Sequence, residues 1–496
     1  MGSARAFALA ILALSLPACS GERRSVLPPG LYWTESPTFA DTAAFTLDIL
    51  VVIDDSAATR DEQASLVAGV SGFIADVTMP PDGDGDHVPD WYPVQELHLG
   101  VISGDMGAPG QAVAGCDELG DDGILNDEPS PAVPGCDADY PQFLDYDLLA
   151  PDPDVGSDFE CIGTLGTDGC GFQQPFAAIQ KALTVHSARG EPNEGFLRVD
   201  ANLAILIVTA GDDCSAGDPS LFGDTGSPEG VRCFENQERL LPLDEAVEGI
   251  LSVKPGRPDR IVVAAIAGVP SDLVALSEAD LESEDVQTAE DFERILADPR
   301  MVEAVDESAE GGGERLVPSC DVPGAGVAFP PRRIVSLVRD IDRQGNGGIV
   351  QSSCGADWQP ALRALARLLA SKAHPMCLSR AILGRNGVPL VTGDRTDCIM
   401  RETLSDDRRC GPGRIPAGSD DGRTVCQVCQ VGDGEDPYSV DLNGTDVTAC
   451  AGSDRFWFYS TDDPDCAGSG LIEFAQDAEP SRDSTIRIEC VHFLPT

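Results

Sequence analysis

The 496-residue sequence has few basic residues, with 33 Lys and Arg against 84 Asp and Glu and a formal net charge of −51. Such a charge repels the phosphates of nucleic acids and anionic lipid headgroups, so the sequence argues against nucleic acid as a partner. Divalent cations are the natural counterions of so acidic a chain. A solvated surface that its charge keeps soluble accounts for the same composition, and this alternative stays open.

Motifs for catalysis are also lacking. None of the five histidines lies in a His-Glu-x-x-His motif, and the chain has neither a Gly-x-Ser-x-Gly elbow nor a Gly-x-x-x-x-Gly-Lys phosphate loop. Acidic pairs could act as general acid and base only if folding placed two of them in one cleft, which their spacing does not indicate. The sequence therefore favours binding over catalysis, with a hydrolase of unrecognised type as an alternative.

Long apolar stretches are absent except for residues 6–16, near the amino terminus. This stretch is too short to cross a bilayer and is typical of an export signal. The Leu-Pro-Ala-Cys sequence that ends at Cys19 resembles a bacterial lipobox. The resemblance implies a signal peptide over residues 1–19 and a lipid on Cys19 as the membrane anchor, and Ser20 indicates sorting to the outer membrane. Ordinary signal cleavage that leaves Cys19 free is the alternative.

The seventeen cysteines fit an oxidising compartment. If Cys19 carries the lipid, an even number remains, which predicts disulfides. A long Gly/Pro/Asp-rich insertion ends near residue 165, and a loop of that length has no core of its own. We therefore expect Cys116 to pair with Cys136 within it. Zinc or a redox function is the alternative for Cys426 and Cys429, although no second ligand pair accompanies them.

The aliphatic run from Leu47 to Ile53 predicts a strand that is buried on both faces of a parallel sheet. The run ends in Asp54, Asp55 and Ser56. Apolar residues at helical spacing follow between positions 66 and 77 and predict an amphipathic helix that packs onto the sheet. We therefore expect these three polar residues at the carboxyl end of a central strand, where open α/β sheets bind their ligands.

Similar strands and helices alternate as far as residue 376. Strands are predicted over 96–103, 203–208, 260–267 and 348–351, and helices over 176–183, 241–253, 334–341 and 358–369. This alternation predicts a doubly wound, mainly parallel α/β sheet with right-handed crossovers. We expect an acidic insertion over 270–330, and a tether over residues 20–45 between the lipid and a domain that spans 46–376.

The composition and pattern of the sequence change at Cys377. The sequence from this point has eight cysteines, Gly/Pro/Asp turns and short alternating runs, such as those at 456–459 and 485–488. These features predict a small β-rich module over residues 377–496 that disulfides stabilise. The number of possible pairings is too large for the sequence to decide among them.

The residues after the first strand, Asp54-Asp55-Ser56-Ala57-Ala58, resemble the Asp-x-Ser-x-Ser start of the metal-ion-dependent adhesion site of von Willebrand factor A (vWA) domains. The resemblance covers roughly residues 45–376. Thr167, in a Gly-rich loop before a predicted helix, matches the threonine position of that site. The resemblance implies a magnesium or manganese ion that Asp, Ser and Thr oxygens hold, with one coordination place open for a carboxylate of the partner.

Two positions depart from the family pattern. Ala58 replaces the second serine, and Thr209-Ala210 stands where vWA domains usually have Thr-Asp. The candidate ligands that remain are Asp54, Ser56, Thr167 and Asp212. Because magnesium demands nearly octahedral coordination, we expect weak or absent metal binding at this degenerate site.

A longer pattern extends the resemblance. The strand before Asp212-Asp213-Cys214-Ser215, with a cysteine loop to Cys233, is similar to large vWA-type lipoproteins of myxobacteria and related proteobacteria. It implies a lipid-anchored protein of the cell envelope, in the outer membrane and facing the periplasm or the surface, that binds a protein or glycan. The alternative is a structural envelope protein with a metal-free vWA scaffold.

A second acidic motif runs from Asp82 to Asp90, with the sequence Asp-Gly-Asp-Gly-Asp-His-Val-Pro-Asp. One Gly-permitted loop can turn several of these carboxylates toward a calcium ion, which tolerates irregular oxygen coordination. The motif resembles the calcium loops of thrombospondin type 3 repeats and dockerins, with His87 in place of the usual Gly. We expect calcium at Asp82, Asp84, Asp86 and Asp90, with a merely acidic turn as the alternative.

Overall fold

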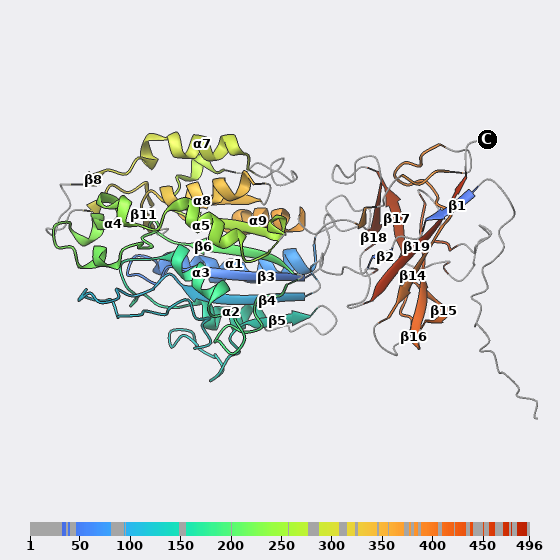
Figure 1. The fold of residues 1–496 in the computed structure, drawn as a ribbon, viewed down its shortest axis with the longest axis horizontal. Coiled ribbons are helices and arrows are strands. Elements are labelled where there is room, and N and C mark those ends of the chain that lie inside the picture. The colour runs from blue at the N-terminus through green and yellow to red at the C-terminus, as the bar shows by residue number, and fades with distance from the viewer. Residues whose placement is uncertain are drawn as a thin grey trace, which may run out of the picture.

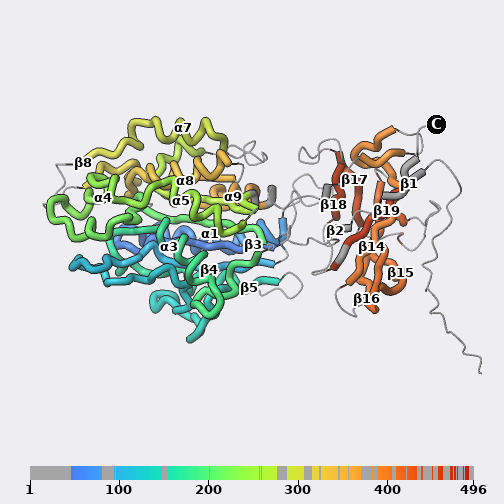
Figure 2. The backbone as a smooth tube through the Cα atoms, in the orientation of Figure 1, coloured from blue at the N-terminus to red at the C-terminus, as the bar shows by residue number. Residues whose placement is uncertain are grey.

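The structure, a computed structural model, comprises a mixed α/β part and a smaller β-rich part (Figures 1 and 2). It describes residues 32–35, 38–39, 46–80, 94, 96–147, 155–199, 201–255, 257–275, 287–306, 315–322, 326–344, 347–355, 357–371, 376–377, 381–384, 388–404, 409–420, 422–432, 437–439, 450, 456–461, 470–475, 478 and 484–493. Among these residues, no helix is long and apolar enough to cross a membrane.

The α/β part is built on a six-stranded sheet with the order β12-β7-β6-β3-β4-β5. Its strands are β3 (Thr46–Ile53), β4 (Glu96–Ser103), β5 (Leu144–Asp147), β6 (Asn202–Val208), β7 (Ile261–Ala267) and β12 (Gly348–Ser352). All pairings are parallel except that of β5, which runs antiparallel to β4 at one edge. Strands β4 and β5 lie on one side of β3, and the later strands β6, β7 and β12 lie on the other, so the strand order reverses between β3 and β6.

Helices cover both faces of this sheet. On one face, Ile49 and Val51 pack with α1 (Arg60–Thr78), α2 (Val155–Gly163) and α9 (Gln359–Ser371). On the other face, Leu50 and Val52 pack with α3 (Pro175–Thr184), α5 (Leu243–Leu251), α7 (Ala289–Ala297) and α8 (Arg332–Asp342). Because side chains alternate along a strand, each apolar run supplies both cores, which is why these strands read as continuous apolar sequence.

The predicted mixed α/β architecture with a mainly parallel sheet is therefore confirmed, and the strand predicted over 348–351 is β12, at one edge of the sheet. The sequence did not indicate β5 or α2, which lie in the predicted first insertion, or α7, which lies in the second. Short elements lie on the side of the sheet where the parallel strands end. They are helix α4 (Arg232–Glu235), the hairpin of β8 (Val305–Asp306) and β9 (Arg315–Leu316), and the hairpin of β10 (Cys320–Val322) and β11 (Gly326–Ala328).

The predicted Cys116–Cys136 disulfide is wrong. Cys116 pairs with Cys170, in the segment just before α3, and Cys136 pairs with Cys161, in α2. The insertion lies against that segment, where the Cys170 backbone N–H donates to Asp105 Oδ2 at 2.9 Å. The Cys116–Cys170 disulfide therefore fastens the insertion to the segment before α3, whereas the Cys136–Cys161 disulfide closes a loop within the insertion.

The β-rich part contains two sheets. One has the order β1-β19-β14-β16-β15, with β2 also paired to β19, and the other has the order β13-β18-β17. Their bounds are β1 (Tyr32–Glu35), β2 (Thr38–Phe39), β13 (Met376–Cys377), β14 (Cys398–Thr403), β15 (Arg414–Asp420), β16 (Arg423–Val428), β17 (Trp457–Ser460), β18 (Leu471–Phe474) and β19 (Thr485–Phe493). Trp457 and Tyr459 are fully buried in its core.

Two features of this part differ from the expectations. Strands β1 and β2 lie within residues 20–45, the expected tether, and they pair with β19, so segments before and after the α/β part share one sheet. Backbone pairing of this kind leaves no periodic signal in strands of two to four residues. Cys426 is bonded to Cys410 and Cys429 to Cys450, which overturns the zinc and redox alternatives for that pair.

Candidate functional site

A cavity of about 360 Å³ opens at the carboxyl ends of β3 and β6. The β3–α1 turn contributes Asp54, Ser56 and Ala58 to its lining, and the segment after β6 contributes residues 210–214. The strand order reverses between these two strands, and a crevice forms at such a point because the connections on either side lead away from each other. The cavity therefore lies where an open α/β sheet binds ligands.

Asp54 lies deepest among the acidic groups of the β3–α1 turn, with 5% of its surface exposed. Its Oδ2 accepts a 2.7 Å hydrogen bond from the Thr209 hydroxyl, and its Oδ1 accepts one of 2.9 Å from the Ser56 backbone N–H. The backbone is held as well, since the Thr59 hydroxyl and the Gln63 amide both donate to the Asp54 carbonyl. The carboxylate is thus fixed between the ends of two central strands.

The partners of the Asp54 carboxylate are all uncharged. Burial raises the pKa of Asp54, while hydrogen bonds from Ser56 and Thr209 act in the opposite direction. Within the described part of the chain, no Lys, Arg or His forms an ion pair with Asp54. A buried carboxylate held only by neutral donors favours the approach of a cation from outside.

Asp55 contacts other side chains than Asp54 does. Its Oδ1 accepts a 2.8 Å hydrogen bond from the Gln173 amide, and Asp55 does not line the cavity. Burial raises the pKa of Asp55 to about 7, and the neighbouring carboxylates Asp105 and Asp121 add to the effect. Asp105 itself accepts from the backbone N–H groups of Gly107 and Cys170, so it holds the insertion against the loop before α3.

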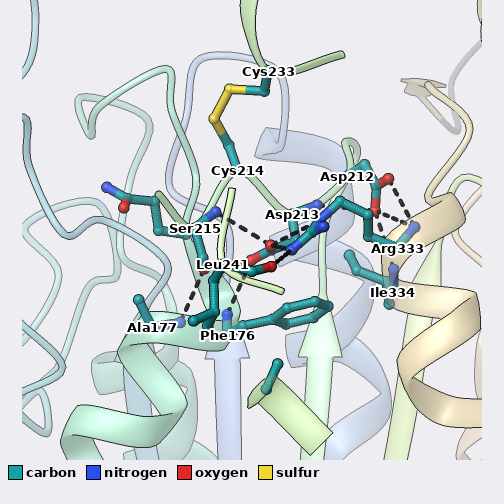
Figure 3. Close-up of polar contacts among 12 residues, drawn as sticks. Phe176, Ala177, Asp212, Asp213, Cys214, Ser215, Cys233, Leu241, Arg333 and Ile334 are labelled. Atoms are coloured by element: carbon teal, nitrogen blue, oxygen red, sulfur yellow. Dashed lines mark hydrogen bonds and ion pairs between the residues drawn. A yellow bond between two sulfur atoms is a disulfide. The ribbon is translucent and has the colours of Figure 1, made fainter. Parts of the chain in front are cut away.

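Asp212 caps a helix. Its carboxylate accepts three hydrogen bonds of 2.9–3.1 Å from the backbone N–H groups of Arg333 and Ile334 in the first turn of α8 (Figure 3). An anionic group is favoured there by the free N–H donors and the helix dipole. Burial, followed by the nearby Glu303 carboxylate, nevertheless raises the pKa of Asp212 to about 7. Its oxygens are committed to α8 and do not complete a shell around Asp54.

Asp213 joins two further elements to the end of β6. Its side chain is fully buried and forms an ion pair with Arg333 at 3.1 Å. It also accepts a 3.1 Å hydrogen bond from the Phe176 backbone N–H at the start of α3 (Figure 3). The Ser215 hydroxyl also donates to it at 2.6 Å. The adjacent Cys214–Cys233 disulfide then fixes the loop that forms one wall of the cavity. The Asp-Asp-Cys-Ser sequence thus holds the cavity wall in place.

The structure separates the residues that the adhesion-site resemblance grouped together. Asp54, Ser56 and Asp212 line the cavity, whereas Thr167 does not and its hydroxyl instead accepts from Arg60 at 3.4 Å. Ala58 and Ala210 also line the cavity and offer only methyl groups. Cys19 and the acidic motif of residues 82–90 lie outside the described residues.

These side chains do not fit the metal ion that the resemblance implies. The oxygens near Asp54 are its own carboxylate and the Ser56 and Thr209 hydroxyls, and the Thr209 hydroxyl already donates to Asp54. In the described ranges, no group of three or more His, Cys, Asp or Glu side chains could hold a metal ion. Magnesium requires nearly octahedral oxygen coordination, which this set does not supply.

Two important residues were not identified from the sequence. Thr209 binds Asp54 directly, and its position at the end of a predicted strand was a usable signal. Arg333 pairs with Asp213 from 120 residues further along the chain, and no local pattern marks it.

Comparison with known proteins gives little to add. No protein-family model matches the chain, and no curated protein matches it. Among solved structures, the pilus adhesin RrgA from Streptococcus pneumoniae is similar at 12% identity and a TM-score of 0.21. The match covers 93% of this chain and 58% of the adhesin, so the chain spans little more than half of that protein's length. A similarity this low carries no argument about fold or function.

Proposed function

We propose that this chain is a lipid-anchored binding protein of the cell envelope that holds a protein or glycan partner in the carboxyl-end cavity of a vWA-type domain. It is a binding protein and not an enzyme. The observation that carries the proposal is the cavity at the reversal of the strand order, with the buried carboxylate of Asp54 in its lining. Ligand sites in doubly wound sheets occupy this position.

Two further observations support the proposal. Across the sheet from β5 to β12, the neighbouring strands are the third, second, first, fourth, fifth and sixth along the chain. One major group of doubly wound sheets has this strand order. Seven disulfides join described residues, and their number places the protein outside the cytoplasm. The lipid on Cys19 and the calcium in the 82–90 loop belong to the proposal through sequence resemblance.

The test compares retention of envelope fragments from the producing bacterium on immobilised full-length protein. Ala58→Trp fills the cavity from an exposed turn and therefore leaves the fold intact. Val199→Trp is the matched control, because Val199 is 86% exposed and follows Arg198, which bonds the opposite end of β3 at Leu47. Thermal unfolding of each variant confirms that the two substitutions are compared in folded protein.

Wild type and Val199→Trp should retain the same amount of envelope material, and Ala58→Trp should retain at least about tenfold less, as expected when a central contact is blocked. Equal retention by all three proteins would move the binding site away from the cavity. Retention no higher than a blank surface would overturn the binding function itself.

A further inference from the structure

We infer that the cavity recognises a cationic side chain, the ammonium of lysine or the guanidinium of arginine, which Asp54 binds directly and without a metal ion. The inference rests on the proposed function and specifies the chemistry of the partner. A metal-loaded adhesion site would take a carboxylate from its partner, so this cavity has the opposite charge preference.

No cationic side chain in the described part of the chain forms an ion pair with the Asp54 carboxylate. Asp54 is 5% exposed and lines the cavity. Its carboxylate accepts hydrogen bonds from uncharged donors, the Ser56 and Ala210 backbone N–H groups and the Ser56 and Thr209 hydroxyls. An ionised carboxylate in such surroundings is stabilised strongly by a cation that also loses its water. Ser56 lines the same cavity, and its hydroxyl oxygen can accept a further hydrogen bond from an ammonium or guanidinium group.

The two arginines that line the cavity, Arg315 and Arg333, contact other groups. Arg333 donates to Asp213 at 3.1 Å and to the Leu241 carbonyl at 2.6 Å. Arg315 lies 3.9 Å from Asp306 on the paired strand of its hairpin. Neither residue forms an ion pair with Asp54, so neither arginine neutralises the negative charge of the Asp54 carboxylate.

The rest of the cavity wall combines apolar side chains with further carboxylates. The two positions where the adhesion motif departs from its family, Ala58 and Ala210, present methyl groups to the cavity beside Asp54. Phe234 and Phe329 add apolar surface. Long basic side chains lay their methylene stems along apolar walls and place the charged end on a polar group, which matches this combination. Glu229 and Glu303 on the same lining add negative charge toward an approaching cation.

The test uses small probes on the full-length protein, with ligand-detected NMR and isothermal titration as readouts. Nα-acetyl-lysine amide and Nα-acetyl-arginine amide are compared with Nα-acetyl-norleucine amide, which keeps an apolar stem and lacks the charge. Nα-acetyl-glutamate amide represents the opposite preference, and all titrations are repeated in EDTA. The variants are Asp54→Asn, and Asp168→Asn as a control at an exposed carboxylate that does not line the cavity.

At least one cationic probe should bind wild type and Asp168→Asn with the same affinity in EDTA. Norleucine amide and the Asp54→Asn protein should each show binding at least about tenfold weaker, the effect expected when a charge-assisted hydrogen bond is lost. Glutamate amide should not bind. Equal binding of the norleucine and lysine probes, or binding of glutamate amide that EDTA abolishes, would overturn the inference.

A second variant guards against a folding defect in Asp54→Asn. Ala58→Lys supplies a tethered ammonium from the turn that borders the cavity, and Ala58→Met supplies a neutral side chain of similar length. The lysine variant should melt at a higher temperature than the methionine variant and should no longer bind the cationic probe. Equal melting temperatures together with unchanged probe binding would contradict the inference.

The two proposals can fail separately. If Ala58→Trp loses envelope retention while Asp54→Asn keeps it and no cationic probe binds, the cavity is the binding site but its ligand is not cationic. If the cationic probe binds at Asp54 while Ala58→Trp retains envelope material normally, the cationic site stands and the partner binds elsewhere.

Discussion

The carboxylate of Asp213 and the guanidinium of Arg333 form a buried ion pair, with Asp213 Oδ2 at 3.1 Å from both Nε and Nη2 of Arg333. The pair joins the carboxyl end of β6 to the first turn of α8, and Asp213 also accepts from the start of α3. One fully buried charge therefore joins β6, α8 and α3 next to residues 210–214, which line the cavity.

Arg333→Met should destabilise the protein by about 3 kcal/mol, because it leaves the Asp213 carboxylate buried without its cation. Chemical denaturation measures this loss. The double variant Asp213→Asn/Arg333→Met should lose less than the sum of its single variants, since no uncompensated charge remains. Arg343→Met is the control, because its partner Glu293 is 53% exposed, and a surface pair contributes about 0–1 kcal/mol. Equal losses in Arg333→Met and Arg343→Met would contradict the assigned role.

Glu62 in the first turn of α1 should make stability depend on pH. It is 1% exposed, and neither of its carboxylate oxygens has a hydrogen-bond partner in the described structure. Burial, with a contribution from Asp54, raises the pKa of Glu62 from 4.5 to about 7. Folded protein then holds a proton that unfolded protein has lost across this window, so this contribution to stability falls as pH rises from 4.5 to 7 and is constant above it.

Glu62→Gln removes this dependence. The variant should be more stable than wild type by about 3 kcal/mol at pH 8, and the difference should fall below about 1 kcal/mol at pH 5. Asp55 and Asp212, with pKa values raised in the same direction, stay in both proteins and cancel in the comparison. Glu118→Gln, at an exposed glutamate, should follow wild type at every pH. A pH-independent difference between wild type and Glu62→Gln would refute the prediction.

The acidic loop of residues 82–90 should bind one calcium ion. Calcium should raise the melting temperature of wild type, because an ion that binds only the folded state stabilises it. The same addition should leave Asp84→Ala/Asp86→Ala unchanged, since two of the four carboxylates are removed. Equal shifts in the two proteins, measured by calorimetry, would show that calcium acts elsewhere.

Cys19 should carry the lipid that anchors the protein. Cys19→Ser removes the thiol that is acylated, so the protein should pass from the detergent phase to the aqueous phase in phase separation. The matched control is Ser20→Ala, which leaves the thiol in place. Unchanged partition of Cys19→Ser would exclude lipid anchoring at this residue.

The periodic elements could be read from the sequence because their signals are local. Strand β7 is apolar along its whole length, β3 is apolar from Ile49 to Ile53 and β6 from Leu203 to Val208. Helices α8 and α9 repeat apolar residues at helical spacing. Strand β5 and helix α2 were missed because they are short and lie within a segment rich in Gly, Pro and Asp. Their stability comes from contact with α1 and β4, which no local pattern reports.

The candidate site was located more reliably than it was interpreted. The position of Asp54 followed from the abrupt end of an apolar run, and the structure places it in the cavity. The direction of the Asp212 carboxylate did not follow, because it depends on a helix that begins 120 residues later. Disulfide pairing failed for the same reason, since Cys116 and Cys170 meet only through the packing of the insertion.

The central claim is that the cavity around Asp54 works without a metal ion, and isothermal titration with magnesium and manganese tests it most directly. Wild type should show no tight site that Asp54→Ala removes, whereas Ala58→Ser/Ala210→Asp should gain one, because it restores a neutral and a charged oxygen beside Asp54. Tight binding to wild type that Asp54→Ala abolishes would contradict the claim and restore the cavity to a metal-dependent adhesion site.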